Sequence, residues 1–200
     1  MMLSDILKKY KIILASQSPR RKYLLTELGL KFEVRPPEVI EESYPKYLAN
    51  EAIALYLAEL KAESFRNRIH PDEIIISADT IVVMNDKVYG KPANYEDSVN
   101  MLSELSGRMH HVYTGVCMYS SLKQHSFFDE TKVFFRELTR EEIDYYIATC
   151  HPFDKAGSYG AQDWIGYTGI VRIEGSYFNV MGLPVHKLYQ ELELFIRDFQ

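Results

Sequence analysis

The stretch Ile12-Ile-Leu-Ala-Ser-Gln-Ser-Pro-Arg-Arg21 decides the fold class. Its four leading apolar residues predict a short buried strand. Ser18 is a good N-cap, and Pro19 suits a first helical turn, where a missing N–H group costs nothing. We therefore expect a strand, a polar loop and a helix in that order, which is typical of an α/β protein.

The loop at the start of this helix has the composition of a phosphate site. Backbone N–H groups and the hydroxyls of Ser16 and Ser18 gather at the positive end of a helix dipole, and Arg20 and Arg21 add forked donors beside them. The same residues are equally typical of an ordinary capped helix with two solvated arginines, so the rest of the sequence has to decide.

Composition limits the class of protein. Two hundred residues, 46% of them hydrophobic, fit one α/β domain or two small lobes that share a sheet, and we expect one compact domain over residues 1–200. A net charge of −5 gives no general attraction to nucleic acid or to an anionic membrane. Any bound phosphate must therefore be held by a local cluster.

Cysteine usage and the N-terminus indicate a compartment. Cys117 and Cys150 have neither CxxC spacing nor a His/Cys ligand pattern, so a disulfide framework and a structural zinc site are not expected. No apolar stretch approaches the roughly 20 residues that span a bilayer, and residues 1–10 do not resemble a signal peptide. We expect a soluble cytoplasmic protein.

The hydrophobic pattern predicts alternating helices and strands. Expected helices cover 19–28, about 46–66, 94–105, 139–149 and 185–199, and expected strands cover 12–15, 31–35, 74–78, 81–84, 87–89, 110–119, 125–135, 170–173 and 177–180. Asn85-Asp86 is typical of a two-residue hairpin turn, and Thr139-Arg-Glu-Glu142 is a capping box. The last two strands are expected to form a hairpin around Glu174-Gly175-Ser176.

Asp79 is the sharpest single candidate for chemistry. The β-branched run Ile74-Ile-Ile-Ser-Ala78 predicts a strand that is buried on both faces and carries Asp79-Thr80 at its carboxyl end, where ligands bind in open α/β sheets. The alternative interpretation is an aspartate that only satisfies a turn or a cap.

Other charged side chains suit the same kind of site: Glu41, Glu42, Lys61, Lys91, Asp154 and Lys155. Each alone is typical of a solvated surface. Together with the two arginines, they fit hydrolysis of a metal-bound polyphosphate, because carboxylates bind Mg²⁺ and activate water while amines neutralise phosphate oxygens. The scattered histidines form no ligand pattern, and no Walker, Rossmann or nucleophile-elbow motif is present.

Six blocks follow one another along the chain: Leu14-Ala-Ser-Gln-Ser-Pro-Arg-Arg21, Ser77-Ala-Asp-Thr-Ile-Val82, Gly90-Lys-Pro92, Ser106-Gly107 with Val112-Tyr-Thr-Gly-Val116, Asp154-Lys-Ala-Gly-Ser-Tyr-Gly-Ala-Gln162, and Asn179-Val-Met-Gly-Leu-Pro184. In this order they resemble the Maf family of nucleoside triphosphate pyrophosphatases, over about residues 12–192. The resemblance implies an elongated mixed sheet flanked by helices, similar to inosine triphosphate pyrophosphatases, with a cleft between two lobes. It also implies cleavage of a nucleoside triphosphate to the monophosphate and pyrophosphate with Mg²⁺ or Mn²⁺, often by a homodimer.

The resemblance also implies roles, position by position. These are the general base at Asp79, further catalytic groups at Glu42 and Lys91, phosphate contacts at Ser16, Ser18, Arg20 and Arg21, other substrate contacts at Lys61, Asp154 and Lys155, and substrate selection at Arg20, Thr80 and Gln162. Metal ligands fall on Asp79 and on the acidic segment Glu38-Val-Ile-Glu-Glu42. This segment has one residue more than is usual in the family, so Glu42 is favoured and Glu41 stays open.

The same blocks are similar to the dTTP/UTP branch of the family. Pro-Arg-Arg, Ala-Asp-Thr and a final Gln162 differ from the Trp, Ser-Asp-Gln and Cys-Ala-Gly of the 7-methyl-GTP branch. Gln162 can offer a donor and an acceptor to a pyrimidine edge, and a small Thr80 leaves room beside it. Modified pyrimidine nucleotides stay open as substrates, and so does a second function, a nucleotide-sensing regulatory protein linked to septum formation or cell division.

Overall fold

The computed structural model describes residues 7–38 and 43–197, which divide into two compact units. Unit 1 comprises the chain up to Asp79, residues 114–129 and residues from 182 onward, and unit 2 comprises residues 80–113 and 130–181. The described strands form one seven-stranded sheet in the order β2-β1-β3-β5-β6-β7, with β4 paired to β3. Strands β3, β5 and β6 each contribute residues to both units.

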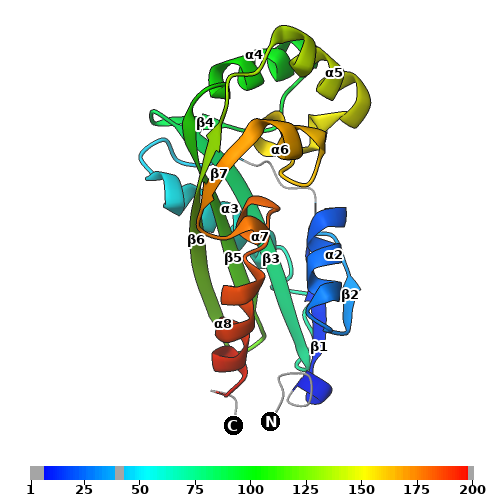
Figure 1. The fold of residues 1–200 in the computed structure, drawn as a ribbon. Coiled ribbons are helices and arrows are strands. Elements are labelled where there is room, and N and C mark those ends of the chain that lie inside the picture. The colour runs from blue at the N-terminus through cyan, green and yellow to red at the C-terminus, as the bar shows by residue number, and fades with distance from the viewer. Residues whose placement is uncertain (1–6, 39–42, 198–200) are drawn as a thin grey trace. The chain divides into compact units, whose positions relative to one another are not determined.

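The elements follow the chain in the order that Figure 1 colours. The strands are β1 (Lys11–Leu14), β2 (Phe32–Val34), β3 (Glu73–Met84), β4 (Lys87–Tyr89), β5 (Met109–Tyr119), β6 (Gln124–Phe135) and β7 (Ile170–Glu174). The helices are α2 (Pro19–Glu27), α3 (Asn50–Glu63), α4 (Tyr95–Leu105), α5 (Arg140–Cys150), α6 (Trp164–Gly169), α7 (Tyr177–Val180) and α8 (Val185–Arg197), with 3₁₀ turns at Leu7–Lys9, Pro152–Asp154 and Ala156–Ser158. The mixed α/β class expected from the sequence is confirmed.

Unit 1 is built on a parallel strand group. β1 lies between β2 and β3 and is parallel to both, with Ile12 opposite Phe32 on one side and Ile74 on the other. Ile13, Ala15, Phe65 and Ile75 form one of its buried clusters. The expectation that the Ile74 run is buried on both faces is confirmed, because every residue from Glu73 to Asp79 is buried.

Unit 2 has its own core beneath the pair of helices α4 and α5, which lie side by side in Figure 1. This core joins Val82, Leu102, Val133, Tyr146 and other buried side chains from the strands and helices. Local signals predicted several of its elements correctly. Asn94 caps α4, Thr139 and Glu142 form the capping box of α5, and Asn85 and Asp86 adopt the positive φ values of a tight hairpin.

Two expectations about the strands are wrong. Asp79 and Thr80 lie in the middle of β3, not at its carboxyl end, because the apolar run continues from Ile81 to Met84 and pairs with β4. Residues Tyr177–Val180 form helix α7 and not the second strand of a hairpin. Ser176 caps that helix by accepting a hydrogen bond from the Asn179 backbone, and Gly175 turns the chain with a φ of 120°.

Smaller differences concern the helix ends and the cysteines. The second expected helix is shorter than its apolar pattern, because α3 begins at Asn50 after an extended Ala49. Both cysteines are thiols, as expected. None of the helices in the described chain has the length and apolar character of a membrane span.

Candidate functional site

The loop between β1 and α2 is organised by its own hydroxyls. Ser16 is buried, and its Oγ accepts hydrogen bonds from the Ser18 N–H (3.2 Å) and from Nη1 of Arg21 (3.4 Å). Ser18 in turn caps the helix by accepting from the Arg21 N–H at 3.5 Å, so the predicted cap is confirmed. The start of α2 therefore has a fixed conformation with its N-terminal dipole behind the loop, which suits an anion.

Arg21 ties this loop to a distant segment of the chain. Nε of Arg21 donates to the carbonyl oxygen of Gly182 at 2.8 Å, in addition to its contact with Ser16. Arg21 thus joins the first sequence block to the last one inside unit 1 and has a structural role that sequence reasoning missed. Arg20 is half-buried on the first turn of α2, next to this tie.

Asp79 and Lys61 meet in unit 1. Nζ of Lys61 donates to Oδ1 of Asp79, and each side chain is only 12% exposed. A buried carboxylate without a partner would be costly, so the lysine compensates the charge that β3 places in the interior. Two residues that the sequence predicted for one site are therefore in direct contact.

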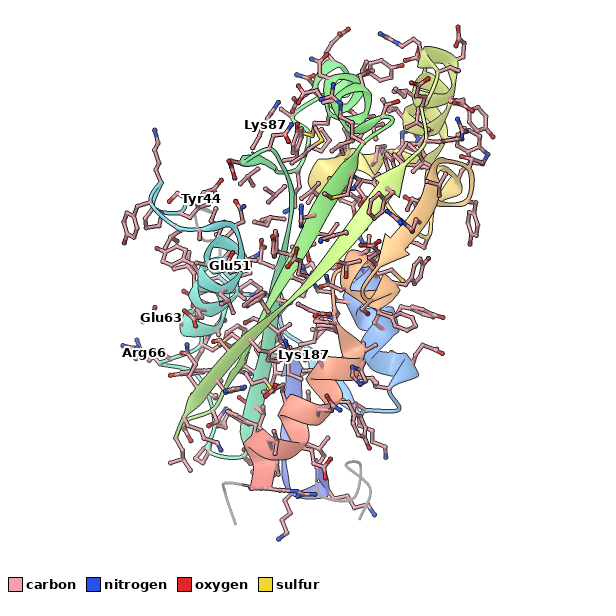
Figure 2. The ribbon with its side chains drawn as sticks, turned by 60° about the vertical axis from the view of Figure 1, so that its left-hand side comes forward. Tyr44, Glu51, Glu63, Arg66, Lys87 and Lys187 are labelled. Atoms are coloured by element: carbon pink, nitrogen blue, oxygen red, sulfur yellow. The ribbon has the colours of Figure 1, made fainter. Side chains whose placement is uncertain are left out.

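Small residues bring α3 close enough for this contact. The Ser77 hydroxyl donates to the Ala58 carbonyl at 2.7 Å, two residues before Asp79 on the same strand. A Cβ on Gly115 of β5 would lie 2.3 Å from the Ala54 carbonyl oxygen, so only glycine allows this approach. Figure 2 labels Glu51 and Glu63 near the two ends of α3, and Glu63 pairs with Arg66 there.

The predicted residues of unit 2 lie on β3 and on two loops. Thr80 is half-buried on β3, and the loop that carries exposed Lys91 is tied by the Gly157 N–H, which donates to the Gly90 carbonyl at 3.0 Å. This bond joins the Gly90-Lys91-Pro92 block to the block that starts at Asp154.

Lys155 lies between two carboxylates of unit 2. Its Nζ is 2.9 Å from Oδ1 of Asp154 and 3.5 Å from Oδ2 of Asp163, and its side chain is only 11% exposed. Asp163 also accepts a hydrogen bond from the Tyr146 hydroxyl at 2.9 Å. Asp163 and Tyr146 were not candidates from the sequence, since no motif marks a contact between residues 17 positions apart.

The acidic candidates of the metal site are only partly described. Glu41 and Glu42 lie outside the described residues. Within residues 7–38 and 43–197, no three histidine, cysteine or acidic side chains form a group that could hold a metal ion. Asp79 is the predicted ligand that the structure places, and a single carboxylate fits Mg²⁺, which takes one or two carboxylates and completes its shell with water and substrate phosphates.

Comparison with known proteins decides the family. The model of the family described as Maf-like protein matches residues 11–195. The chain belongs to this family. It is 58% identical over 187 residues to a protein of Phocaeicola vulgatus named dTTP/UTP pyrophosphatase, with 94% of this chain and 97% of that protein covered. Proteins of Porphyromonas gingivalis W83 (50% identical; 96% of this chain and 97% of that protein) and Parabacteroides distasonis (52% identical; 94% and 98%) have the same name.

A solved structure gives a weaker likeness to this Maf-like chain. It is described as the structure of a HAM1 protein from Coxiella burnetii, and it superposes with a TM-score of 0.45 and 14% identity. The superposition covers 63% of this chain and 73% of that chain.

Proposed function

We propose that this protein hydrolyses dTTP and UTP to the nucleoside monophosphates and pyrophosphate, with modified pyrimidine nucleotides as further candidate substrates. The observation that carries the proposal is the match to relatives with that name, which are 50–58% identical and extend over nearly the whole chain. The contact between Lys61 and Asp79 supports it from the structure, because it sets a carboxylate and an amine of the expected site side by side.

Asp79 acts as the general base in this proposal. Lys61 holds Oδ1, which leaves Oδ2 to take a proton from the attacking water. The water oxygen bonds to the α-phosphorus, the bond from that phosphorus to the bridging oxygen breaks, and pyrophosphate leaves with the bonding electron pair. Arg20, Lys91 and Lys155 neutralise phosphate oxygens, and Ser16, Ser18 and Arg21 shape the loop that receives them.

A divalent cation, Mg²⁺ or Mn²⁺, is part of the proposal. Asp79 and Glu42, with Glu41 as the alternative to Glu42, would hold it. When bound, the cation would lower the negative charge of the phosphates and polarise them.

Gln162 and Thr80 are proposed to select the base. A glutamine amide can donate to O4 and accept from N3–H of thymine or uracil.

Asp154 is proposed as a further substrate contact, next to Lys155, with which it forms an ion pair. We also propose a single functional domain over residues 1–200, a cytoplasmic location and a homodimer. The regulatory function is not better supported than hydrolysis by the names of the relatives.

A steady-state assay tests this function. Pyrophosphate release is measured for dTTP, UTP, CTP, GTP, ATP and dCTP with Mg²⁺ or Mn²⁺. We expect dTTP and UTP to have the highest kcat/KM. Nucleotide binding without turnover under either metal would instead support the regulatory protein.

A further inference from the structure

Tyr146, Gly160 and Asp163 form a connected set beside two predicted substrate contacts. The Tyr146 hydroxyl accepts a hydrogen bond from the Gly160 N–H at 3.1 Å and donates one to Oδ2 of Asp163 at 2.9 Å. Tyr146 is completely buried on α5, and burial raises the pKa of its hydroxyl well above the ordinary value, so this group stays a donor. The loop from Lys155 to Asp163 is thereby fixed to the core of unit 2.

Gly160 brings two side chains together above its backbone. A Cβ at this position would lie 2.6 Å from Oδ2 of Asp163 and 2.9 Å from Nε2 of Gln162. The glycine therefore leaves the space in which the carboxylate of Asp163 and the amide of Gln162 sit. Its φ is not in the left-handed region, so the missing side chain, and not backbone freedom, is what the site uses.

Of the two carboxylates next to Lys155, Asp163 is the one better shielded from solvent. The Lys155 ammonium is largely buried, while Asp154, its other carboxylate partner, is about half exposed and screened by water. A buried ammonium needs a charged partner, and Asp163 is held in place by Tyr146.

We propose that Tyr146, Gly160 and Asp163 are positioning residues, which hold Lys155 for the phosphates and Gln162 for the base. The proposal rests on the pyrophosphatase function proposed above, and it adds residues that act through Lys155 and Gln162 without touching substrate. Loss of the Asp163 charge lets Lys155 turn toward solvent, so nucleotide affinity falls while the chemical step changes less.

The first test is a double-mutant cycle. Affinity for the α,β-methylene analogue of dTTP is measured by calorimetry for wild type, Asp163→Asn, Lys155→Met and the double variant. We expect Asp163→Asn to weaken binding roughly tenfold, as for loss of a charge-assisted contact, and to add almost nothing when Lys155 is already Met. An equal effect of Asp163→Asn in both backgrounds would overturn the action through Lys155.

Tyr89, Glu104 and Lys87 form the same tyrosine–carboxylate–lysine arrangement as Tyr146, Asp163 and Lys155, and they give the control. Tyr89 donates to Glu104 at 2.6 Å, and Glu104 pairs with Lys87, which Figure 2 labels, at 2.7 Å. Tyr89 is also buried, and none of the three is a predicted site residue. Glu104→Gln should leave KM within about twofold of wild type. If Asp163→Asn changes KM no more than Glu104→Gln does, the positioning role is wrong.

Gly160→Ala tests the same set from the backbone. The added methyl group meets Oδ2 of Asp163, which Tyr146 holds, and Nε2 of Gln162, so the Gln162 amide is the group that has to move. The melting temperature, measured beside the kinetics, shows that the variant stays folded. Displacement of Gln162 should reduce the preference for dTTP over CTP by roughly tenfold. An unchanged preference would contradict the proposal. If wild type hydrolyses no triphosphate but the binding cycle behaves as expected, the proposed function fails, while the action of Asp163 on nucleotide binding through Lys155 still holds.

Discussion

Nζ of Lys61 donates a hydrogen bond to Oδ1 of Asp79, and both side chains are almost excluded from solvent. The pair joins helix α3 to the middle of strand β3 within unit 1. Because each charge compensates the other, the carboxylate of Asp79, which we propose as the general base, also affects the free energy of unfolding.

Lys61→Met removes the ammonium and keeps an apolar side chain of similar length. The remaining Asp79 charge is then buried without compensation, so the free energy of unfolding should fall by about 3 kcal/mol. The double variant Lys61→Met with Asp79→Asn should recover part of that loss, since no uncompensated charge remains. Urea unfolding measures both, and a double variant no more stable than Lys61→Met would contradict the coupling.

Arg20 and Arg21 should respond differently to replacement by lysine. Arg20→Lys should raise KM and lower kcat/KM, because a point charge cannot make a forked contact with phosphate oxygens. The loss of kcat/KM should correspond to roughly 1.5–3 kcal/mol of transition-state stabilisation. Arg21→Lys should mainly lower the melting temperature, because it breaks the tie to Gly182. Kinetics and thermal unfolding on both variants check this, and normal kinetics for Arg20→Lys would end its assignment to the phosphates.

Gln162→Ala should alter base preference more than the rate on the best substrate. A site that pairs both edges of a base discriminates strongly, and loss of the amide leaves the base edges unpaired. The measurement is kcat/KM for dTTP, UTP, CTP and GTP. The same ranking in the variant and in wild type would show that another residue reads the base.

Glu142→Gln should make stability less dependent on acid pH. Hydrogen bonds from the Arg136 guanidinium and the Thr139 N–H lower the pKa of Glu142 from its ordinary value to about 2. Since the folded pKa is lowered, its contribution is complete above about pH 4.5 and is lost as pH falls toward 2. The pair is partly exposed, so the variant should be less stable by only about 1 kcal/mol at pH 7.

Chemical unfolding between pH 7 and pH 3 measures that contribution. The difference between wild type and Glu142→Gln should shrink as the pH falls. A difference that stays constant would mean that the lowered pKa of Glu142 in the folded state does not contribute to stability.

Local signals explain what the sequence could predict. The caps Ser18, Asn94 and Thr139 act within three residues of their partners, and the Asn85-Asp86 turn depends only on its own φ values, so the pattern of nearby residues was sufficient. Strands β1 and β3 pair in parallel, and each contains an uninterrupted buried apolar run, residues 12–14 in β1 and residues 74–76 in β3.

Contacts between distant residues explain what it could not. Arg21 and Gly182 are 161 positions apart, so no local pattern indicates their bond. Tyr177–Val180 has the aromatic and β-branched composition of a strand, and a cap at Ser176 overrides that preference. The roles of the site residues taken from the resemblance stay predictions, while contacts among them, such as those of Lys61 with Asp79 and of Lys155 with Asp154, are features of the structure.

The most direct test of the proposed chemistry is turnover of dTTP by wild type and Asp79→Asn across a titration of Mg²⁺ and of Mn²⁺, with products separated and dTTP affinity measured independently. Asp79→Asn keeps the size of the side chain and loses the proton acceptor. Wild type should form equal amounts of dTMP and pyrophosphate, and kcat of the variant should fall by about 10²–10⁴ with affinity retained and no rescue by excess metal. Full rescue by metal would make Asp79 a metal ligand only and move the base to Glu42 or Glu41. Near wild-type turnover by Asp79→Asn, or release of dTDP and inorganic phosphate, would contradict the account.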